Sequence, residues 1–387
     1  MRIVYHYTAF GTVGGTDRMI LSKASYLADV LGYEVFLVTD SQKESSDFFF
    51  PLSKNLMHID LDVDFSQEYN HKFVGRVYWY YKLMWIYKKR LISLLNELNP
   101  DIVIVTLGRE MAIIRQLVHP GRKLVGETHV AKPFVRNLYL LKARGGIFPF
   151  VARYLERQME KGVAYLDKLV VLTEDARKQW EPFADAVAIP NFNNLYPDQL
   201  VDGKYGKTVI AVGRLNEQKG FDMLIDSWKR VYQRHPDWKL NIYGNGEDKS
   251  NLERQICDAG LSGIVIINEA VRNIEERYMR SDFYVLSSRC EGWGLVLLEA
   301  MGCGIPCVSF DCPDGPRHII QEGINGLLVK NGDVVELADK ICWMIEHPEE
   351  RRVMGENGRK RALDFTQPEI MRRWDELFRT LMTEKVD

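Results

Sequence analysis

The sequence predicts an α/β protein with two domains, each built on a parallel sheet covered by helices. Three observations predict this fold class. Short apolar runs typical of buried strands alternate along the chain with longer segments of helical periodicity, which is the pattern of strands joined by helical crossovers. A polar stretch interrupts this alternation near the middle of the chain. The alternation then resumes with a new apolar run, Thr208-Val209-Ile210-Ala211-Val212.

The strands are assigned first, because their short apolar runs are bounded by polar or turn-forming residues. Strands are predicted at residues 2–7, 34–39, 102–106, 123–128, 168–172, 186–189, 208–212, 239–243, 263–267, 283–287, 306–310 and 326–329.

Helical periodicity fills most of the gaps between these strands. Thr173 followed by two acidic residues is a helix start, because a threonine can cap the first turn and acids favour it. Further helices are predicted at residues 16–31, 76–98, 109–118, 221–234, 249–259, 274–280, 294–302 and 333–346.

The domain boundary is predicted in the polar, proline-containing stretch that ends the first run of alternation. Ile189-Pro190-Asn191 and Tyr196-Pro197-Asp198 are typical of a linker. We therefore expect an N-terminal domain over residues 1–195 and a C-terminal domain over 205–365. The amphipathic segment 366–387 is expected to form a helix that crosses back to the first domain.

The bulk composition indicates a protein that folds around sizeable cores without crossing a membrane. The chain has 387 residues, of which 46% are hydrophobic, and no apolar run approaches the ~20 residues of a membrane span. It begins directly with a strand, so no signal peptide is expected and we predict a cytoplasmic location. The six cysteines lack a CxxC pair, so they predict neither a zinc site nor a disulfide framework.

Charge is unevenly distributed. Residues 72–161 hold 17 Lys and Arg against 6 Asp and Glu, although the whole chain has a net charge of −2. Aromatic clusters such as Tyr78-Trp79-Tyr80-Tyr81 lie in the same segment. Two interpretations remain open: a surface that contacts anionic membrane, or solvated helices with their aromatic side chains in the core. Nucleic acid is not expected as a partner, because the chain as a whole is acidic.

The most informative motif follows the strand predicted at 283–287. Glu291 and Glu299 are eight residues apart, with Gly292-Trp293-Gly294 and an apolar run between them and Gly-Ile-Pro after them. A glycine loop that opens a helix presents free backbone N–H groups and the positive end of the helix dipole, which attract phosphate. Eight residues span about 2.2 helical turns. Glu291 is therefore expected at the mouth of the helix and Glu299 deeper in it.

This motif resembles the E-x7-E signature of retaining glycosyltransferases of family 4, which have the GT-B fold of two Rossmann-like domains around a cleft. The resemblance is clearest over residues 207–330. It implies that Glu291 orients the transferred sugar and Glu299 holds the nucleotide ribose. The donor contacts that it implies are Gly14, Gly15, Gly213, Gly292, Trp293, Gly294, Leu295 and Glu299.

A second loop supplies cations. The strand 208–212 leads into Gly213-Arg214, and Lys219-Gly220 follows before a helix. This spacing resembles the diphosphate-binding pattern of the same family. Arginine can bind phosphate oxygens with two parallel hydrogen bonds, and lysine adds a compact charge. Arg214 and Lys219 are therefore predicted to stabilise the leaving diphosphate. Gly244-Asn245-Gly246 after the next strand fits either a ligand loop or a plain turn.

The first domain should hold the acceptor. Its glycine loop, which includes Gly14 and Gly15, follows the first strand and lacks the spacing of a nicotinamide fingerprint. His129 follows a predicted strand, and the resemblance implies that it lies near the reacting sugar.

Two features depart from the family pattern or fall outside it. His318 occupies a position where members of the family carry an acidic residue. Any contact that the family makes through this carboxylate is therefore in doubt here. Asp60-Leu61-Asp62-Val63-Asp64 contains a D-x-D pattern that belongs to a different glycosyltransferase fold, and chance explains it better here. No metal and no other cofactor is therefore expected.

The sequence thus predicts a glycosyltransferase that moves a sugar, with retention of configuration, from a nucleotide-diphosphate sugar. A UDP-sugar is the expected donor, and a saccharide or lipid-linked saccharide the expected acceptor, in cell-surface polysaccharide or lipopolysaccharide synthesis. Two alternatives remain open. One is a nucleotide-sugar epimerase or a phosphorylase on the same fold. The other is a non-catalytic scaffold that binds sugar nucleotide.

Overall fold

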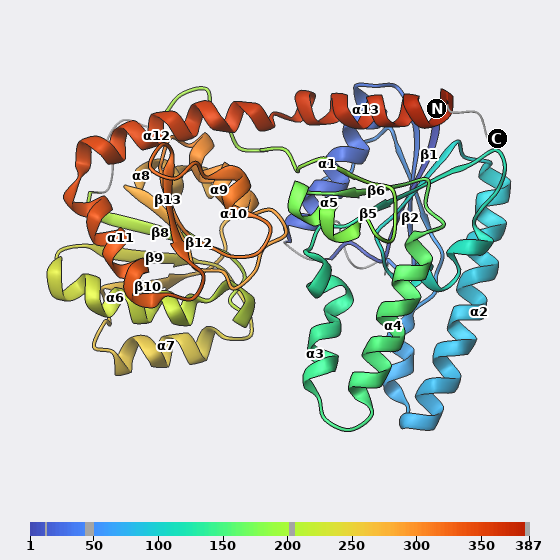
Figure 1. Cartoon of the computed structure of the whole chain (residues 1–387), viewed down its shortest axis with the longest axis horizontal. Helices are drawn as coiled ribbons and strands as arrows, with labels where there is room; N and C mark the ends of the chain where they lie inside the picture. Colours follow the sequence, from blue (N-terminus) through green and yellow to red (C-terminus); the bar gives the residue numbers. More distant parts are fainter. Residues whose placement is uncertain (12–13, 43–49, 201–205, 384–387) are drawn as a thin grey trace. The chain divides into compact units, whose positions relative to one another are not determined.

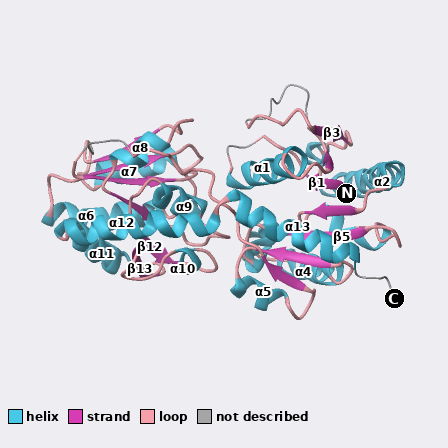
Figure 2. Ribbon diagram, turned by 90° about the horizontal axis from the view of Figure 1, so that it is seen from above, coloured by secondary structure: helices cyan, strands magenta, loops and turns pink. Residues whose placement is uncertain are grey.

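The computed structural model describes residues 1–11, 14–42, 50–200 and 206–383, which form two compact units (Figures 1 and 2). The first unit comprises residues 1–189 together with the chain from Met371 onward, and the second comprises residues 190–370. Each unit has its own parallel sheet with flanking helices, as the sequence predicts. In the described part of the chain, no helix combines the length and apolar character that crossing a membrane requires.

The first unit contains a seven-stranded sheet in the order β3-β2-β1-β4-β5-β6-β7, with every pairing parallel. Its strands are β1 (Arg2–Tyr7), β2 (Glu34–Thr39), β3 (Leu56–Asp60), β4 (Ile102–Val105), β5 (Lys123–Glu127), β6 (Lys168–Val171) and β7 (Ala186–Ala188). Its helices are α1 (Gly15–Asp29), α2 (Phe73–Leu98), α3 (Leu138–Ala143), α4 (Phe148–Val163), α5 (Glu174–Trp180) and most of α13 (Gln367–Thr383). Its 3-10 helices are η1 (Phe65–Asn70), η2 (Arg109–Ala112), η3 (Ile114–Gln116) and η4 (Lys132–Asn137).

The second unit contains a six-stranded parallel sheet in the order β10-β9-β8-β11-β12-β13. Its strands are β8 (Thr208–Val212), β9 (Lys239–Tyr243), β10 (Val265–Asn268), β11 (Phe283–Leu286), β12 (Cys307–Asp311) and β13 (Gly326–Lys330). Its helices are α6 (Phe221–Arg234), α7 (Lys249–Asp258), α8 (Glu275–Arg280), α9 (Leu295–Gly302), α10 (Pro316–Ile319), α11 (Val334–Glu346) and α12 (Pro348–Ala362), and its 3-10 helices are η5 (Glu217–Lys219) and η6 (Leu363–Phe365).

The strand order of each sheet determines where a ligand site can form. The order reverses direction between β1 and β4 in the first sheet and between β8 and β11 in the second. In open parallel sheets, ligands bind outside the carboxyl ends of the strands at such a switch point. The loops that follow β8 and β11 are those that carry Lys219 and Glu291, so the fold brings the two predicted loops of the second unit to one place.

Two sequence expectations are wrong in detail, and one strand is not predicted. The helix expected at 109–118 is replaced by η2 and η3, because Ile113 leaves helical geometry between them. The edge strand β3 lacks a clear apolar alternation, and the sequence reading does not find it. Helix α9 begins only at Leu295, after Gly294 adopts a left-handed conformation with φ of 91°. Glu291 therefore lies in a loop before the helix, and a helical projection from Glu291 to Glu299 does not apply.

Candidate active site

The clearest cluster of predicted residues lies at the switch point of the second sheet. Lys219 Nζ lies 2.7 Å from Glu291 Oε1, and the hydroxyl of Ser288 donates a hydrogen bond of 2.6 Å to the same oxygen. Glu291 is largely buried. Among the described residues, its second oxygen, Oε2, has no hydrogen-bond partner. The arrangement fixes the carboxylate through one oxygen and leaves the other able to accept a further hydrogen bond.

Glycines explain how the lysine reaches this position. A Cβ on Gly213 would lie 3.2 Å from the Cγ and Cδ atoms of Lys219, so the bare glycine makes room for the lysine stem. Gly220 adopts φ of 61°, and a Cβ there would lie 2.1 Å from the carbonyl oxygen of Ser287. Ser287 Oγ donates to the carbonyl oxygen of Lys219 at 3.0 Å. The loop after β8 and the loop after β11 are therefore in direct backbone contact.

A pair of residues that the sequence reading did not single out fastens these two loops together. The guanidinium of Arg289 donates to both carboxylate oxygens of Asp222 at 2.8 and 2.7 Å. Burial acts to raise the pKa of Asp222, but the hydrogen bonds and charge of Arg289 outweigh it and hold that pKa below its usual value. Gln218 Nε2 also donates to the carbonyl oxygen of Cys290 at 3.0 Å. In the sequence, this pair is indicated only by the position of Arg289 two residues before Glu291 and by the position of Asp222 in the first turn of α6.

Arg214 lies in the same loop but points into solvent. Its side chain is 65% exposed, and its nearest acidic partner is Glu247, at 3.7 Å from Nη2 to Oε2. Such an exposed pair contributes little to stability, so the guanidinium can leave it to bind another anion. The Gly244–Gly246 turn has a structural role, because a Cβ on Gly244 would lie 1.9 Å from the carbonyl oxygen of Gly213.

The remaining motif residues of the second unit lie on or next to α9. Glu299 is buried, and Tyr278 donates its hydroxyl to Glu299 Oε2 at 3.3 Å. Trp293 is also buried, with its ring edge-on to Phe365 at 5.4 Å between centroids. The indole thus faces the interior of the unit. Gly292 and Leu295 are half-buried on either side of the Trp293-Gly294 turn.

The loop before His318 lies close to Glu291. His318 is half-buried on the short helix α10. A Cβ on Gly315 would lie 2.6 Å from the carbonyl oxygen of Trp293 and 3.0 Å from the Cβ of Glu291. This loop therefore packs directly on the loop that carries Glu291. In the sequence, only the Gly315-Pro316 pair indicates such a contact.

The cysteine beside Glu291 is not set up as a nucleophile. Burial and the charge of Glu291 raise the pKa of Cys290 to about 11. The thiol is therefore protonated at neutral pH, whereas nucleophilic cysteines need a lowered pKa. Cys303, Cys307, Cys312 and Cys342 are also buried.

In the first unit, the predicted glycine loop leads into α1. Gly14 is the N-cap of this helix and Gly15 its first residue. Asp17 is buried, and it accepts hydrogen bonds from the hydroxyl of Tyr7 at 2.8 Å and from the backbone N–H of Gly11 at 3.3 Å. Thr12 and Val13, within this loop, lie outside the described residues.

His129 follows β5 in a buried polar cluster. Its Nε2 lies 3.1 Å from Glu127 Oε1, and Glu127 also accepts hydrogen bonds from Lys23 and Tyr5. Burial, reinforced by the positive charge of Lys23, lowers the pKa of His129 well below its usual value. The imidazole is therefore neutral at neutral pH, and it can donate or accept one hydrogen bond but cannot supply a charge.

A pH measurement tests this environment. As the pH falls below about 6.5, unfolded His129 takes up a proton while folded His129 does not, so the folded state loses stability. Glutamine takes up no proton, so the unfolding free energy of His129→Gln should fall less steeply below pH 6.5 than that of the wild type. We expect the difference to be up to about 1.4 kcal/mol for each pH unit, measured by urea unfolding from pH 5 to 8. The exposed His119→Gln is the control. Parallel stability curves for wild type and His129→Gln would contradict the burial argument.

A second buried cluster lies at the switch point of the first sheet. His6 Nε2 lies 2.8 Å from Asp40 Oδ1 and 3.2 Å from the hydroxyl of Tyr87. Burial acts to lower the pKa of His6, but Asp40 and Glu110 outweigh it and raise that pKa. Arg109 Nη1 lies 3.8 Å from Asp40 Oδ2. The sequence does not predict this cluster, because its members come from four separate segments.

The D-x-D aspartates have local structural roles. Asp60 ends β3 and accepts the backbone N–H of Gln42 at 2.7 Å. Asp64 caps η1 by accepting the N–H of Ser66. Asp62 is exposed, with Arg90 Nη1 at 3.4 Å from its Oδ2.

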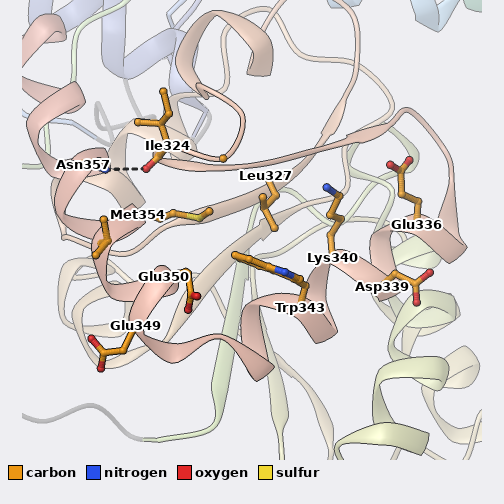
Figure 3. A pocket seen from close by; sticks show the side chains of 12 residues that line it. Ile324, Leu327, Glu336, Asp339, Lys340, Trp343, Glu349, Glu350, Met354 and Asn357 are labelled. Carbon is orange, nitrogen blue, oxygen red and sulfur yellow. Dashed lines mark hydrogen bonds between the residues drawn. The ribbon is translucent and has the colours of Figure 1, made fainter.

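A groove lies elsewhere on the second unit, between α11, α12 and the turn before β13 (Figure 3). Its volume is about 810 Å³, and Trp343, Leu327 and Met354 form its floor with acidic side chains around them. Among the described residues, none of those predicted from the motifs lines it.

Comparison with known proteins shows what the second unit resembles. Residues 195–361 match the family model described as Glycosyl transferases group 1. The second unit is therefore similar to the group 1 domain of glycosyltransferases. The whole chain is similar to an uncharacterized glycosyltransferase of Haemophilus influenzae, with 28% identity over 96% of this chain and 98% of the relative.

Two further relatives extend this finding. The chain is 31% identical to the amylovoran biosynthesis glycosyltransferase AmsD of Erwinia amylovora, over 44% of this chain and 47% of AmsD. The fold of the whole chain is similar to that of a TarM mutant of S. aureus, solved with Fondaparinux, alpha-GlcNAc-glycerol and UDP. That likeness has a TM-score of 0.76 at 16% identity, over 97% of this chain and 99% of TarM. The predicted GT-B fold class is thereby confirmed.

Proposed function

We propose that the chain transfers a sugar from a nucleotide-diphosphate sugar to a saccharide or lipid-linked saccharide, with retention of configuration. A UDP-sugar is the proposed donor. The observation that carries the proposal is the Lys219–Glu291 pair at the switch point of the second unit, held at 2.7 Å by two loops in backbone contact. The presence of UDP and a GlcNAc-glycerol in the S. aureus structure supports the donor and acceptor classes.

The pair suggests a division of roles. As a sugar bond to diphosphate breaks, negative charge grows on the phosphate oxygens, and a positioned cation stabilises it. Lys219 would supply that charge, and Arg214, which is exposed and only weakly paired, would close on the diphosphate from solvent. Glu291 would accept a hydrogen bond from a sugar hydroxyl through Oε2.

The other predicted residues would complete donor binding. Glu299, held by Tyr278, would bind the ribose hydroxyls. The backbone around Gly292, Gly294 and Gly213 would approach the donor closely, because glycine allows such an approach. Neutral His129 would donate or accept a hydrogen bond at the sugar or diphosphate. No side chain is proposed as a covalent nucleophile.

The process we propose is cell-surface polysaccharide or lipopolysaccharide synthesis, and the likeness to AmsD, a glycosyltransferase of amylovoran biosynthesis, supports it. An epimerase or phosphorylase would use the same donor site, but water or phosphate would replace the saccharide acceptor. A non-catalytic scaffold would bind the donor without turnover. The Lys219–Glu291 pair favours a catalyst, because it places a cation for the diphosphate beside a carboxylate for the sugar hydroxyls at the switch point of the sheet.

Product analysis tests the proposal. The protein is incubated with UDP-, GDP- and ADP-sugars, with and without saccharide acceptors, and the product linkage is determined by NMR. We expect an alpha linkage from an alpha-linked donor, with full activity in EDTA because the cations already neutralise the diphosphate. A beta linkage would overturn retention. Loss of activity in EDTA that manganese restores would overturn the metal-independent site.

A further inference from the structure

The structure distinguishes between the two interpretations of the basic, aromatic segment in the first unit. Helix α2 buries one stripe of side chains, including Leu83, Tyr87 and Leu91. A second stripe on the same helix, Tyr78, Tyr81 and Trp85, is exposed, with Tyr81 at 67% and Trp85 at 58%. The spacing of three and four residues places these three rings on one face. Core packing therefore accounts for the first stripe, whereas the second stripe is exposed to solvent.

A second helix of the same unit repeats this arrangement. In α4 and the turn before it, Ile147, Phe150 and Tyr154 recur at three- and four-residue spacing and are exposed, with Phe150 at 72%. Met159 and Val163 of the same helix are buried instead. In Figure 1, the turn between α3 and α4 and the first turns of α2 extend to the same end of the unit, away from the sheet.

Cations accompany both stripes. Residues 72–90 contain six Lys and Arg and no Asp or Glu. Lys82 Nζ lies 4.3 Å from the centre of the Trp79 ring, and Lys89 Nζ lies 3.9 Å from that of Trp85. Along α4, Arg153 and Arg157 are exposed beside the stripe. The aromatic rings therefore lie within a positively charged surface.

We propose that this surface, formed by the exposed stripes of α2 and α4 with their lysines and arginines, docks the protein on an anionic lipid membrane. Tryptophan and tyrosine favour the membrane–water interface, and long cationic side chains keep their charges at the headgroups while their stems lie on apolar surface. A protein partner fits less well, because lysine is depleted in protein interfaces. The proposal is independent of the proposed reaction. If the protein docks in this way, an acceptor held in the membrane would be within reach of the first unit.

Vesicle flotation tests the docking. We expect the protein to float with phosphatidylcholine vesicles that contain phosphatidylglycerol, and high salt to release it. Lys82→Gln with Lys89→Gln should lower the partition coefficient by roughly 30-fold, at about 5-fold per cation. Phe150→Glu should lower it by roughly 10-fold or more through lost apolar insertion. Both sites are exposed, so circular dichroism should show folding unchanged.

Matched changes on the second unit provide the control. Val353→Glu and Lys360→Gln alter exposed positions of α12 and should float like wild type. The proposal is overturned if the protein stays unbound at low salt, or binds neutral vesicles equally well. It is also overturned if the α2 and α4 variants float like wild type. Self-association that Phe150→Glu abolishes, without vesicle binding, would make the stripes a protein interface instead.

Discussion

Replacing Lys219 with methionine is expected to lower kcat/KM for the sugar donor by roughly 10²- to 10³-fold, the usual effect of removing one positioned charge from a transition state. Methionine keeps an unbranched stem of similar length, so the packing against Gly213 is retained. The substitution removes the ammonium that lies 2.7 Å from Glu291. The expected loss is therefore electrostatic, and steady-state kinetics with a UDP-sugar measures it.

A matched lysine on the next helix separates this effect from a general loss of charge. Lys229 lies on α6, is about half exposed and pairs with Asp226 at 2.8 Å, so Lys229→Met should leave kcat/KM unchanged. Arg214→Ala should cost about 10²-fold, because it removes the second cation of the same loop. If Lys219→Met retains wild-type kcat/KM, the diphosphate role of this loop is wrong.

The sequence predicts the strands well because parallel-sheet strands are buried on both faces and appear as uninterrupted apolar runs. The twelve predicted strands coincide with observed ones to within two residues at each end. The missing strand, Leu56–Asp60, lies at the sheet edge and carries a half-buried His58 between apolar residues. An edge strand needs less apolar surface, so its pattern is too weak to recognise.

The candidate site is predictable in part. Glu291 and Lys219 can be located because glycines flank them, and the structure brings them together. The Arg289–Asp222 pair cannot be found in this way, because its residues are 67 positions apart and only the strand order makes their loops neighbours. For the aromatic segment, helical periodicity shows that stripes exist on α2. It does not show which stripe faces the core, because both contain large aromatic side chains.

Replacing Gly220 with alanine is expected to be strongly disruptive to the second unit. The new Cβ would lie 2.1 Å from the carbonyl oxygen of Ser287, a backbone atom that cannot move alone. The residue also has φ of 61°, which costs a non-glycine residue about 1–2 kcal/mol. With overpacking of about 1–3 kcal/mol, we expect a total loss of about 2–5 kcal/mol in unfolding free energy, measured by urea unfolding.

A second glycine isolates the close approach from the backbone strain. Gly260 has φ of 70°, but nothing lies within 4 Å of where its Cβ would be. Gly260→Ala should therefore cost only the strain, about 1–2 kcal/mol, and leave donor kinetics intact. Gly220→Ala should also lower kcat/KM, because separating the start of α6 from Ser287 moves the adjacent Lys219 away from Glu291. Equal destabilisation by the two substitutions would mean that the loops after β8 and β11 tolerate separation. The pairing of Lys219 with Glu291 would then not depend on their backbone contact.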